Sequence, residues 1–249
     1  MRFTTTGILF AAMVLAVSAA AQIAPSPPTT ARKVVAATKL PTVTSVPLYF
    51  KVQSIALSPG EKANVSGTNS VLYQLSGSTD VSGVGETRTL GKGDGLLIAF
   101  GMTTELRAVS GAPSVLLQFL LSTGSDLDRP TTTGLAAVKE LYRTAAPIPD
   151  LKPGPHDLNL TQVTFPAGMP SNAPHHRSGA ALYYVVSGTG ANTVDGKTTA
   201  KGPGSLVYEP YGLVHQWGNP GNEPLTFVTF NMNQEGVAAV LPGVPARTQ

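Results

Sequence analysis

Cysteine is absent from the 249 residues of the sequence. Its absence excludes disulfide bonds, metal sites built on thiolates and a cysteine nucleophile. Charged residues are also scarce, at 12% of the chain, and 17 basic against 14 acidic residues give a formal net charge of only +3. A charge this small argues against nucleic acid and against an anionic membrane surface as partners.

Long apolar runs are missing everywhere except at the N-terminus. A basic start at Arg2 precedes an apolar run from Ile8 to Ala20, and small residues around Ala21 offer a cleavage site. The run is shorter than the ~20 residues that a membrane-spanning helix needs. We therefore predict a signal peptide over residues 1–21, a secreted or periplasmic location, and no membrane contact after cleavage. Residues 22–47 are rich in proline, threonine and alanine and predict a flexible tether.

From Leu48 onward the sequence consists of short β-type runs separated by glycine turns, a texture typical of an all-β sandwich or barrel. One segment, residues 134–143, departs from it. Leu135, Val138 and Leu141 recur there at helical spacing, which predicts a short amphipathic helix. A breaker-rich linker with Pro147 follows before strand texture resumes.

The two halves of the chain are similar to each other. Residues 71–77 (VLYQLSG) are echoed by residues 182–188 (LYYVVSG), and the Lys-Gly-x-Gly turn at Lys92 is echoed at Lys201. A β unit of about 100 residues is thus present twice. We predict an N-terminal β domain over 48–128, a helix and proline-rich linker over 129–155, a C-terminal β domain over 156–240 and a tail over 241–249.

One stretch carries a specific motif. Residues 204–219 follow the spacing G-x5-P-x-G-x2-H-x3-N, with a Pro-x-Gly turn at Pro210 that delivers His215 between two strand-like runs. This spacing resembles the second signature motif of the cupin superfamily. With the internal repeat, the chain resembles a bicupin, which implies two tandem jelly-roll β-barrels.

The first cupin motif, by contrast, is degraded. In the family this motif contains two histidines in an H-x-H pair, followed by a glutamate. Ala181 occupies the position that corresponds to the glutamate. The pair aligns either as His175-x-Arg177 or as Pro174-x-His176, so that one imidazole is lost in both cases. His175 and His176 are neighbours on an extended backbone and should face opposite sides. We favour the first alignment, because the Ser-Gly turn then directly follows the pair.

The candidate site lies in the C-terminal domain, since the N-terminal unit contains no histidine. The candidate ligand-binding residues are His175, Arg177, Tyr183, His215 and Trp217. The candidate metal ligands are His175, His176 and His215, with Glu209 as a substitute oxygen donor. No cofactor is certain: the resemblance implies one divalent transition metal (Mn, Fe, Ni, Cu or Zn), whereas a guanidinium beside the site would oppose a cation.

Two main functions follow as hypotheses. In the first, the C-terminal barrel binds a small organic ligand bearing a carboxylate, which Arg177 would hold in a two-point contact. In the second, the protein is a metal-dependent dioxygenase or isomerase that uses His175 or His176 together with His215. A structural or assembly module with an unused pocket is a third alternative. The resemblance also allows a homodimer.

Overall fold

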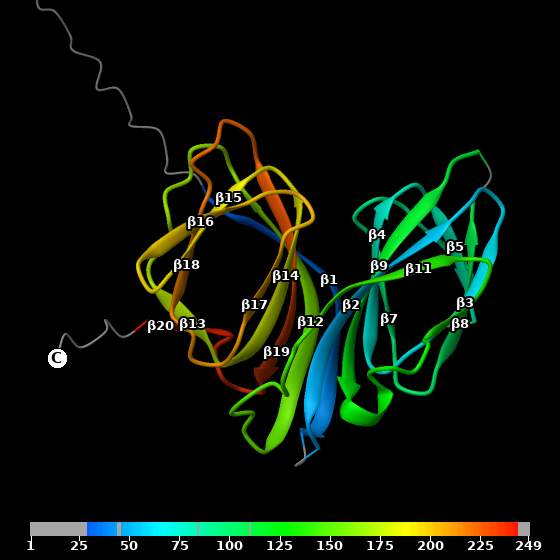
Figure 1. Cartoon of the computed structure of the whole chain (residues 1–249), viewed down its shortest axis with the longest axis horizontal. Helices are drawn as coiled ribbons and strands as arrows, with labels where there is room; N and C mark the ends of the chain where they lie inside the picture. Colours follow the sequence, from blue (N-terminus) through cyan, green and yellow to red (C-terminus); the bar gives the residue numbers. More distant parts are fainter. Residues whose placement is uncertain (1–28, 44–45, 84, 110, 244–249) are drawn as a thin grey trace, which may run out of the picture.

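The computed structural model describes residues 29–43, 46–83, 85–109 and 111–243. The predicted signal peptide and the last residues of the predicted tail lie outside these ranges. Within them the chain forms two tandem β-barrels that lie side by side, the C-terminal barrel on the left and the N-terminal barrel on the right of Figure 1. Each barrel consists of two five-stranded antiparallel sheets. The prediction of an all-β fold with two jelly-roll barrels is thus confirmed.

The N-terminal barrel closes over an aliphatic interior that includes Ile55, Leu72 and Leu106. Its inner sheet has the strand order β11 (Ala137–Arg143), β2 (Leu48–Leu57), β9 (Ser114–Thr123), β4 (Ser70–Ser76), β7 (Gly95–Ile98). Its outer sheet has the order β10 (Thr132–Gly134), β3 (Lys62–Ser66), β8 (Thr103–Ala108), β5 (Thr79–Ser82), β6 (Arg88–Leu90). A single 3₁₀ turn, η1 (Gly124–Asp126), follows β9.

The C-terminal barrel repeats this plan around an aromatic interior that includes Tyr183, Trp217 and Phe227. Its inner sheet has the order β1 (Ala31–Val43), β12 (Gly154–Phe165), β19 (Leu225–Gln234), β14 (Gly179–Ser187), β17 (Leu206–Glu209). Its outer sheet has the order β16 (Lys197–Lys201), β15 (Gly190–Val194), β18 (His215–Gly218), β13 (His175–Arg177), β20 (Val240–Pro242).

The inner sheets of the two barrels pack face to face (Figure 1). Phe50 of β2 and Phe119 of β9 lie 5.3 and 5.8 Å, between ring centroids, from Phe230 of β19. Successive residues of a strand point to opposite faces, so β12 sends Leu158 into this shared layer and Val163 into the C-terminal barrel. The central strands β9 and β19 of the inner sheets are therefore buried on both faces, and the two barrels share one large apolar layer.

The predicted helix over residues 134–143 is wrong, because most of this segment forms strand β11. The strand pairs with β2 and carries a register shift between Glu140 and Tyr142. Such a bulge places two consecutive residues on one face. Leu141 and Tyr142 consequently both pack against the layer between the barrels. Because of this bulge, the apolar residues of β11 do not alternate strictly, and their spacing resembles that of a helix.

The predicted tether is wrong for residues 31–43. This segment forms β1, which pairs along β12 of the C-terminal barrel although it precedes the N-terminal barrel in the sequence. A register shift between Val34 and Ala36 again lets two neighbours, Val35 and Ala36, pack on the shared layer. The C-terminal barrel therefore includes a strand from the very start of the described chain, and the predicted domain boundaries change accordingly.

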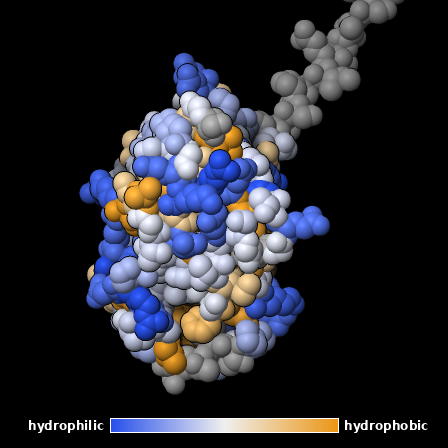
Figure 2. All heavy atoms as spheres, turned by 90° about the vertical axis from the view of Figure 1, so that its right-hand side faces the viewer, coloured by the Kyte–Doolittle hydropathy of each residue, from blue (hydrophilic) through white to orange (hydrophobic). Residues whose placement is uncertain are grey.

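The outer face of the N-terminal barrel, seen in Figure 2, is a mixture of hydrophilic and apolar residues in which the apolar ones are scattered. Exposed apolar side chains on this barrel include Phe100 and Leu135. In the part of the chain that the structure describes, no helix has the length and hydrophobicity to cross a membrane.

Candidate functional site

Two histidines lie side by side in the outer sheet of the C-terminal barrel. His175 of β13 is paired directly with His215 of β18, and their ring centroids are 4.3 Å apart. The Pro210-Tyr-Gly212 turn brings the chain back into β18, with Gly212 at a φ of 75° that favours glycine. His215 is only 1% exposed. The His215 imidazole is therefore buried close to the 175–177 segment.

Backbone carbonyls fix the orientation of both rings. Nδ1 of His215 is 2.9 Å from the carbonyl of Leu213, and Nδ1 of His175 is 2.9 Å from the carbonyl of Ala173. A carbonyl only accepts hydrogen bonds, so each Nδ1 must carry the proton and donate. The Nε2 atom of each ring is thereby left for other chemistry.

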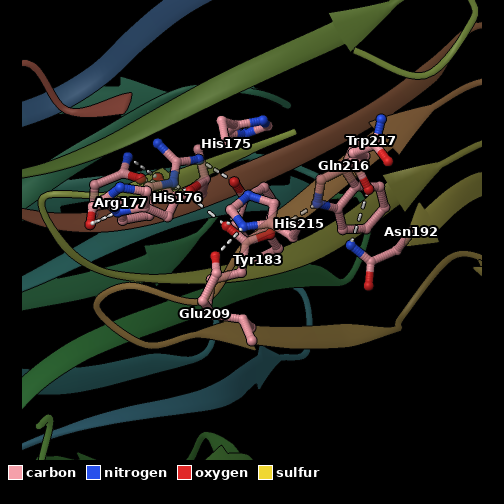
Figure 3. A network of polar contacts seen from close by, with 12 residues as sticks. His175, His176, Arg177, Tyr183, Asn192, Glu209, His215, Gln216 and Trp217 are labelled. Carbon is pink, nitrogen blue, oxygen red and sulfur yellow. Dashed lines mark hydrogen bonds and ion pairs between the residues drawn. The ribbon is translucent and has the colours of Figure 1, made fainter. Parts of the chain in front are cut away.

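Glu209 of β17 faces the Nε2 atom of His215 inside the barrel (Figure 3). Its Oε2 lies 2.9 Å from Nε2 of His215, and both side chains are fully buried. The distance is that of an ion pair, but the ring nitrogen is not aligned for a hydrogen bond, and Nε2 of His215 has no other partner among the described atoms.

The guanidinium of Arg177 lies beside this carboxylate as well. It is 6% exposed, its Nε–H donates to Oε2 of Glu209 at 3.4 Å, and its Nη2–H donates to the hydroxyl of Tyr183. The guanidinium also lies over the Tyr183 ring, 5.5 Å from its centroid. Since His175 and Arg177 are two residues apart on β13, they share the inward face. The structure thus brings together the residues of the favoured H-x-R alignment.

The other carboxylate oxygen of Glu209 is held by the indole. Nε1–H of Trp217 donates to Oε1 at 2.9 Å. Burial by itself would raise the pKa of Glu209, but the contacts with His215, Arg177 and Trp217 outweigh it and hold this pKa below the ordinary 4.5. Burial lowers the pKa of His175 and raises that of Tyr183.

Stacked aromatic rings form the floor of the site. Tyr183 stacks on Trp217 at 5.4 Å between centroids, and Trp217 stacks on Phe227 at 5.2 Å. A cavity of about 370 Å³ opens against these rings. Its other walls carry His175 and Arg177 from β13, and Arg32 from β1.

His176, a candidate metal ligand, lies away from this group. Its Nδ1 contacts the carbonyl of Arg177 at 3.2 Å, and its ring lies edge-on to Tyr211 with centroids 6.3 Å apart. The alternation of the strand sends it to the face opposite His175, as expected for neighbours on an extended backbone. His175, Arg177, Tyr183, Glu209, His215 and Trp217 are brought together.

Two residues of the site were missed by sequence reasoning. Arg32 lay in the segment assigned to the tether, and only the pairing of β1 with β12 brings it to the cavity. Phe227 lines the cavity from β19. Its alternation with Leu225 was a signal for the inward face, since every second residue of a strand points the same way.

The side chains present do not fit a transition metal ion. Both oxygens of Glu209 are already engaged by donors, and the Arg177 guanidinium beside them would repel a cation. Among the residues that the structure describes, no group of three or more His, Asp or Glu side chains is arranged to hold a metal ion. A metal would require this buried network to open.

Comparison with known proteins supports the family resemblance. Residues 161–231 match the family model of the cupin domain. No curated protein matches the chain. The fold is similar to oxalate decarboxylase from Bacillus subtilis (17% identity, TM-score 0.54, covering 81% of this chain and 73% of that one). It is also similar to AerE from Microcystis aeruginosa (14% identity, TM-score 0.54, covering 74% of this chain and 88% of that one). A third similar structure is a variant of salicylate 1,2-dioxygenase from Pseudoaminobacter salicylatoxidans (14% identity, TM-score 0.51, covering 77% of this chain and 76% of that one).

At these identities the structural neighbours are similar in fold alone, whereas the family model addresses the sequence itself. The matched residues run from β12 to β19 and include Glu209 and His215. The match to the cupin domain model therefore lies within the C-terminal barrel, and the structural neighbours are similar to the chain as a whole in fold.

Proposed function

We propose that the protein binds a small organic acid with an apolar or aromatic body in the cavity of its C-terminal barrel, and that it does so without a metal ion. The observation that carries the proposal is the closed network around Glu209. Arg177, His215 and Trp217 occupy the carboxylate that a metal would need. What remains open is a cavity with stacked rings on one side and cationic or imidazole groups on the other.

The charges around the cavity favour an anion. Arg177 is balanced by Glu209, so the unbalanced positive charge is that of Arg32 at the exposed mouth. No ion pair of Arg32 occurs within the described ranges of the chain. An arginine guanidinium outside any ion pair can donate two parallel N–H hydrogen bonds to a carboxylate.

The tandem architecture is part of the proposal. We interpret the chain as a bicupin in which only the C-terminal barrel binds ligand. In the N-terminal barrel Leu106, near the position that corresponds to His215, is fully buried in an aliphatic core. That barrel then serves as a structural partner through the shared apolar layer.

Direct binding of benzoate tests the proposal, because benzoate carries a ring and a carboxylate and is small enough for the cavity. The neutral isostere benzamide is the matched ligand control. We expect benzoate to stabilise the purified protein against heat, by ~2.7 kcal/mol at a hundredfold excess over its dissociation constant. Arg32→Ala should lower the affinity for benzoate about fivefold, which corresponds to the free energy of one exposed ion pair. Arg107→Ala, which removes an exposed arginine from β8 of the other barrel, should leave benzoate binding unchanged.

A metal-dependent enzyme is the second candidate, and one observation favours it. Both imidazoles have Nδ1 tied to the backbone, so Nε2 is the ring nitrogen that would bind a metal, in His215 only after its contact with Glu209 opens. Metal analysis of the purified protein separates the candidates. Stoichiometric Mn, Fe, Ni, Cu or Zn that is lost in His215→Ala would replace the metal-free proposal with the enzymatic one.

Export belongs to the proposal as well. Residues 1–21 have the composition of a signal peptide. Mass spectrometry of the protein recovered from the periplasm or the medium should give a mature N-terminus at Gln22. An intact N-terminus on the cell-associated protein would contradict export.

A further inference from the structure

A layer of polar side chains, most of them uncharged, lies on the inner sheet of the C-terminal barrel. Its residues belong to β12 and β19, two strands that lie side by side (Figure 1). These side chains alternate along each strand, so they share the face that looks into the barrel. Three pairs stand directly opposite each other: Asp157 with Asn233, Asn159 with Asn231, and Thr161 with Thr229. On the same face, farther along the strands, Val163 and Phe227 belong to the apolar interior. The inside of the barrel thus has a polar half and an apolar half.

Most of this layer is satisfied by its own hydrogen bonds. The Thr229 hydroxyl donates to Oδ1 of Asn231 at 2.7 Å, and Nδ2 of Asn231 donates to Oδ1 of Asn159 at 2.8 Å. The Thr161 hydroxyl donates to the same Asn159 oxygen at 3.0 Å. These bonds fix the side chains in place, which is what a preorganised binding surface requires.

The last member of the layer has an unpaired oxygen. Asn233 is 3% exposed, and its Oδ1 accepts no hydrogen bond from any atom of the described residues. Leaving a buried amide oxygen unpaired costs free energy, so native proteins rarely do so without a reason. Asn233 lines a cleft of about 580 Å³ between β1, β12 and β19 on one side and Ala239 and Val240 on the other. A hydrogen-bond donor in this cleft would satisfy it.

The N-terminal barrel provides an internal comparison. Gln53 of β2 and Gln118 of β9 stand directly opposite each other, just as Asn159 and Asn231 do. Nε2 of Gln53 donates to Oε1 of Gln118 at 2.8 Å, and the Thr131 hydroxyl donates to the same oxygen at 3.1 Å. In that barrel the opposing amides are closed off by the protein's own donors. In the C-terminal barrel the corresponding layer faces a cleft and ends in a free acceptor.

We propose that this cleft is a second binding subsite, for an uncharged polyhydroxylated molecule such as a sugar or an inositol. Amides and hydroxyls offer donors and acceptors together, which match the hydroxyl group and not a fixed charge. The charges at the rim are largely balanced: Lys39 pairs with Glu235, and Asp157 stands opposite Lys39. The cleft shares Arg32, Arg177 and Val240 with the aromatic cavity, but its polar wall is its own. The subsite does not depend on the binding of an acid next to it.

Isothermal titration calorimetry with myo-inositol and D-galactose tests the subsite, and cyclohexanol is the control for a ring with a single hydroxyl. A melting assay would be misleading here, because polyols at high concentration stabilise proteins by exclusion from their surface. We expect saturable heat with at least one of the two polyols and none with cyclohexanol. Heat that fails to saturate with both polyols would overturn the proposal.

Two variants locate the binding. Asn233→Ala removes the unpaired acceptor and should lower the affinity for the polyol about tenfold. This corresponds to the loss of one ordinary buried hydrogen bond. Its unfolding midpoint should stay close to that of the parent, since the Asn233 side-chain oxygen has no hydrogen-bond partner among the described residues. Asn64→Ala, on an exposed position of β3, is the matched control and should bind as the parent does.

Ala239→Trp fills the mouth of the cleft from an exposed segment and should abolish polyol binding even if Asn233→Ala does not fold. Unchanged polyol affinity in Ala239→Trp would also overturn the proposal. Benzoate binding separates this subsite from the acid-binding cavity. The Asn233→Ala variant should bind benzoate as the parent does. A parent protein that binds polyol but not benzoate refutes only the proposed function, and one that binds benzoate but not polyol refutes only the subsite.

Discussion

Ala181 and Glu209 stand directly opposite each other on the neighbouring strands β14 and β17. The family resemblance placed a glutamate at position 181, and the structure puts an alanine there with no exposed surface. The missing carboxylate is replaced by one that enters the same region from the next strand. It arrives together with Arg177, and this pairing turns a place suited to a cation into a neutral, hydrogen-bonded cluster.

Removal of the Glu209 carboxylate should destabilise the protein strongly. Glu209→Ala leaves the buried Arg177 guanidinium without its counter-charge, and such unpaired buried charges cost ~3–5 kcal/mol. Equilibrium unfolding in urea at pH 7 measures the loss. A change below about 1 kcal/mol would show that the pair contributes no more than an exposed ion pair does.

The double variant Glu209→Ala with Arg177→Met is the control for this interpretation. It removes both charges, and replacement of a whole buried pair by apolar side chains is often close to neutral. We expect the double variant to be more stable than Glu209→Ala alone. If it is less stable, the loss in the single variant comes from a cavity and not from an unpaired charge.

The pH dependence of stability should carry a contribution from His175. Burial lowers the pKa of His175 below its ordinary value of 6.5, so the unfolded chain binds a proton more readily than the folded one. The stabilising contribution is therefore present above about pH 6.5 and is lost as the pH falls through the lower pKa of the folded state. In His175→Gln the slope of the unfolding free energy between pH 7 and 5 should become flatter than in the parent. An equal slope in both proteins would contradict this.

The sequence was sufficient to predict features whose pattern is regular. The Pro-x-Gly turn located His215, and the alternation of β13 separated His175 from His176. Glu209 was identified as a residue of interest, but only the pairing of β14 with β17 explains why it faces the place of Ala181. Pairing between strands distant in sequence is not encoded in any local spacing.

Both strands that were missed, β1 and β11, contain a register shift. A bulge breaks the two-residue alternation by which strands are recognised. In β11 it produced a false helical spacing at Leu141 and Tyr142, and in β1 it left a segment that read as a tether. The polar layer at Asn231 and Asn233 was missed for a different reason. Both faces of β19 are buried, so its alternation is between amides and apolar residues within a single buried strand.

Trp217 is the only tryptophan of the chain and should report directly on the aromatic cavity. It is 1% exposed and packs against both Tyr183 and Phe227, so iodide should quench its fluorescence poorly in the folded protein. Benzoate entering the cavity should change the emission intensity in a saturable way. Strong quenching by iodide in the folded state would show that the indole is accessible and that the stacked arrangement is not maintained in solution.

The N-terminal strand should be required for a stable C-terminal barrel. A chain that begins at Leu48 lacks β1, which exposes the edge of β12 and removes Leu40 from the layer between the barrels. Unpaired strand edges promote association, and loss of a buried leucine side chain costs ~2–5 kcal/mol. We expect this chain to unfold at lower urea concentration and to aggregate, as measured by light scattering. A chain that begins at Thr30 keeps the whole of β1 and is the matched control. If both chains unfold at the same midpoint, β1 contributes nothing to the barrel, and Arg32 would have no rigid strand to hold it at the cavity.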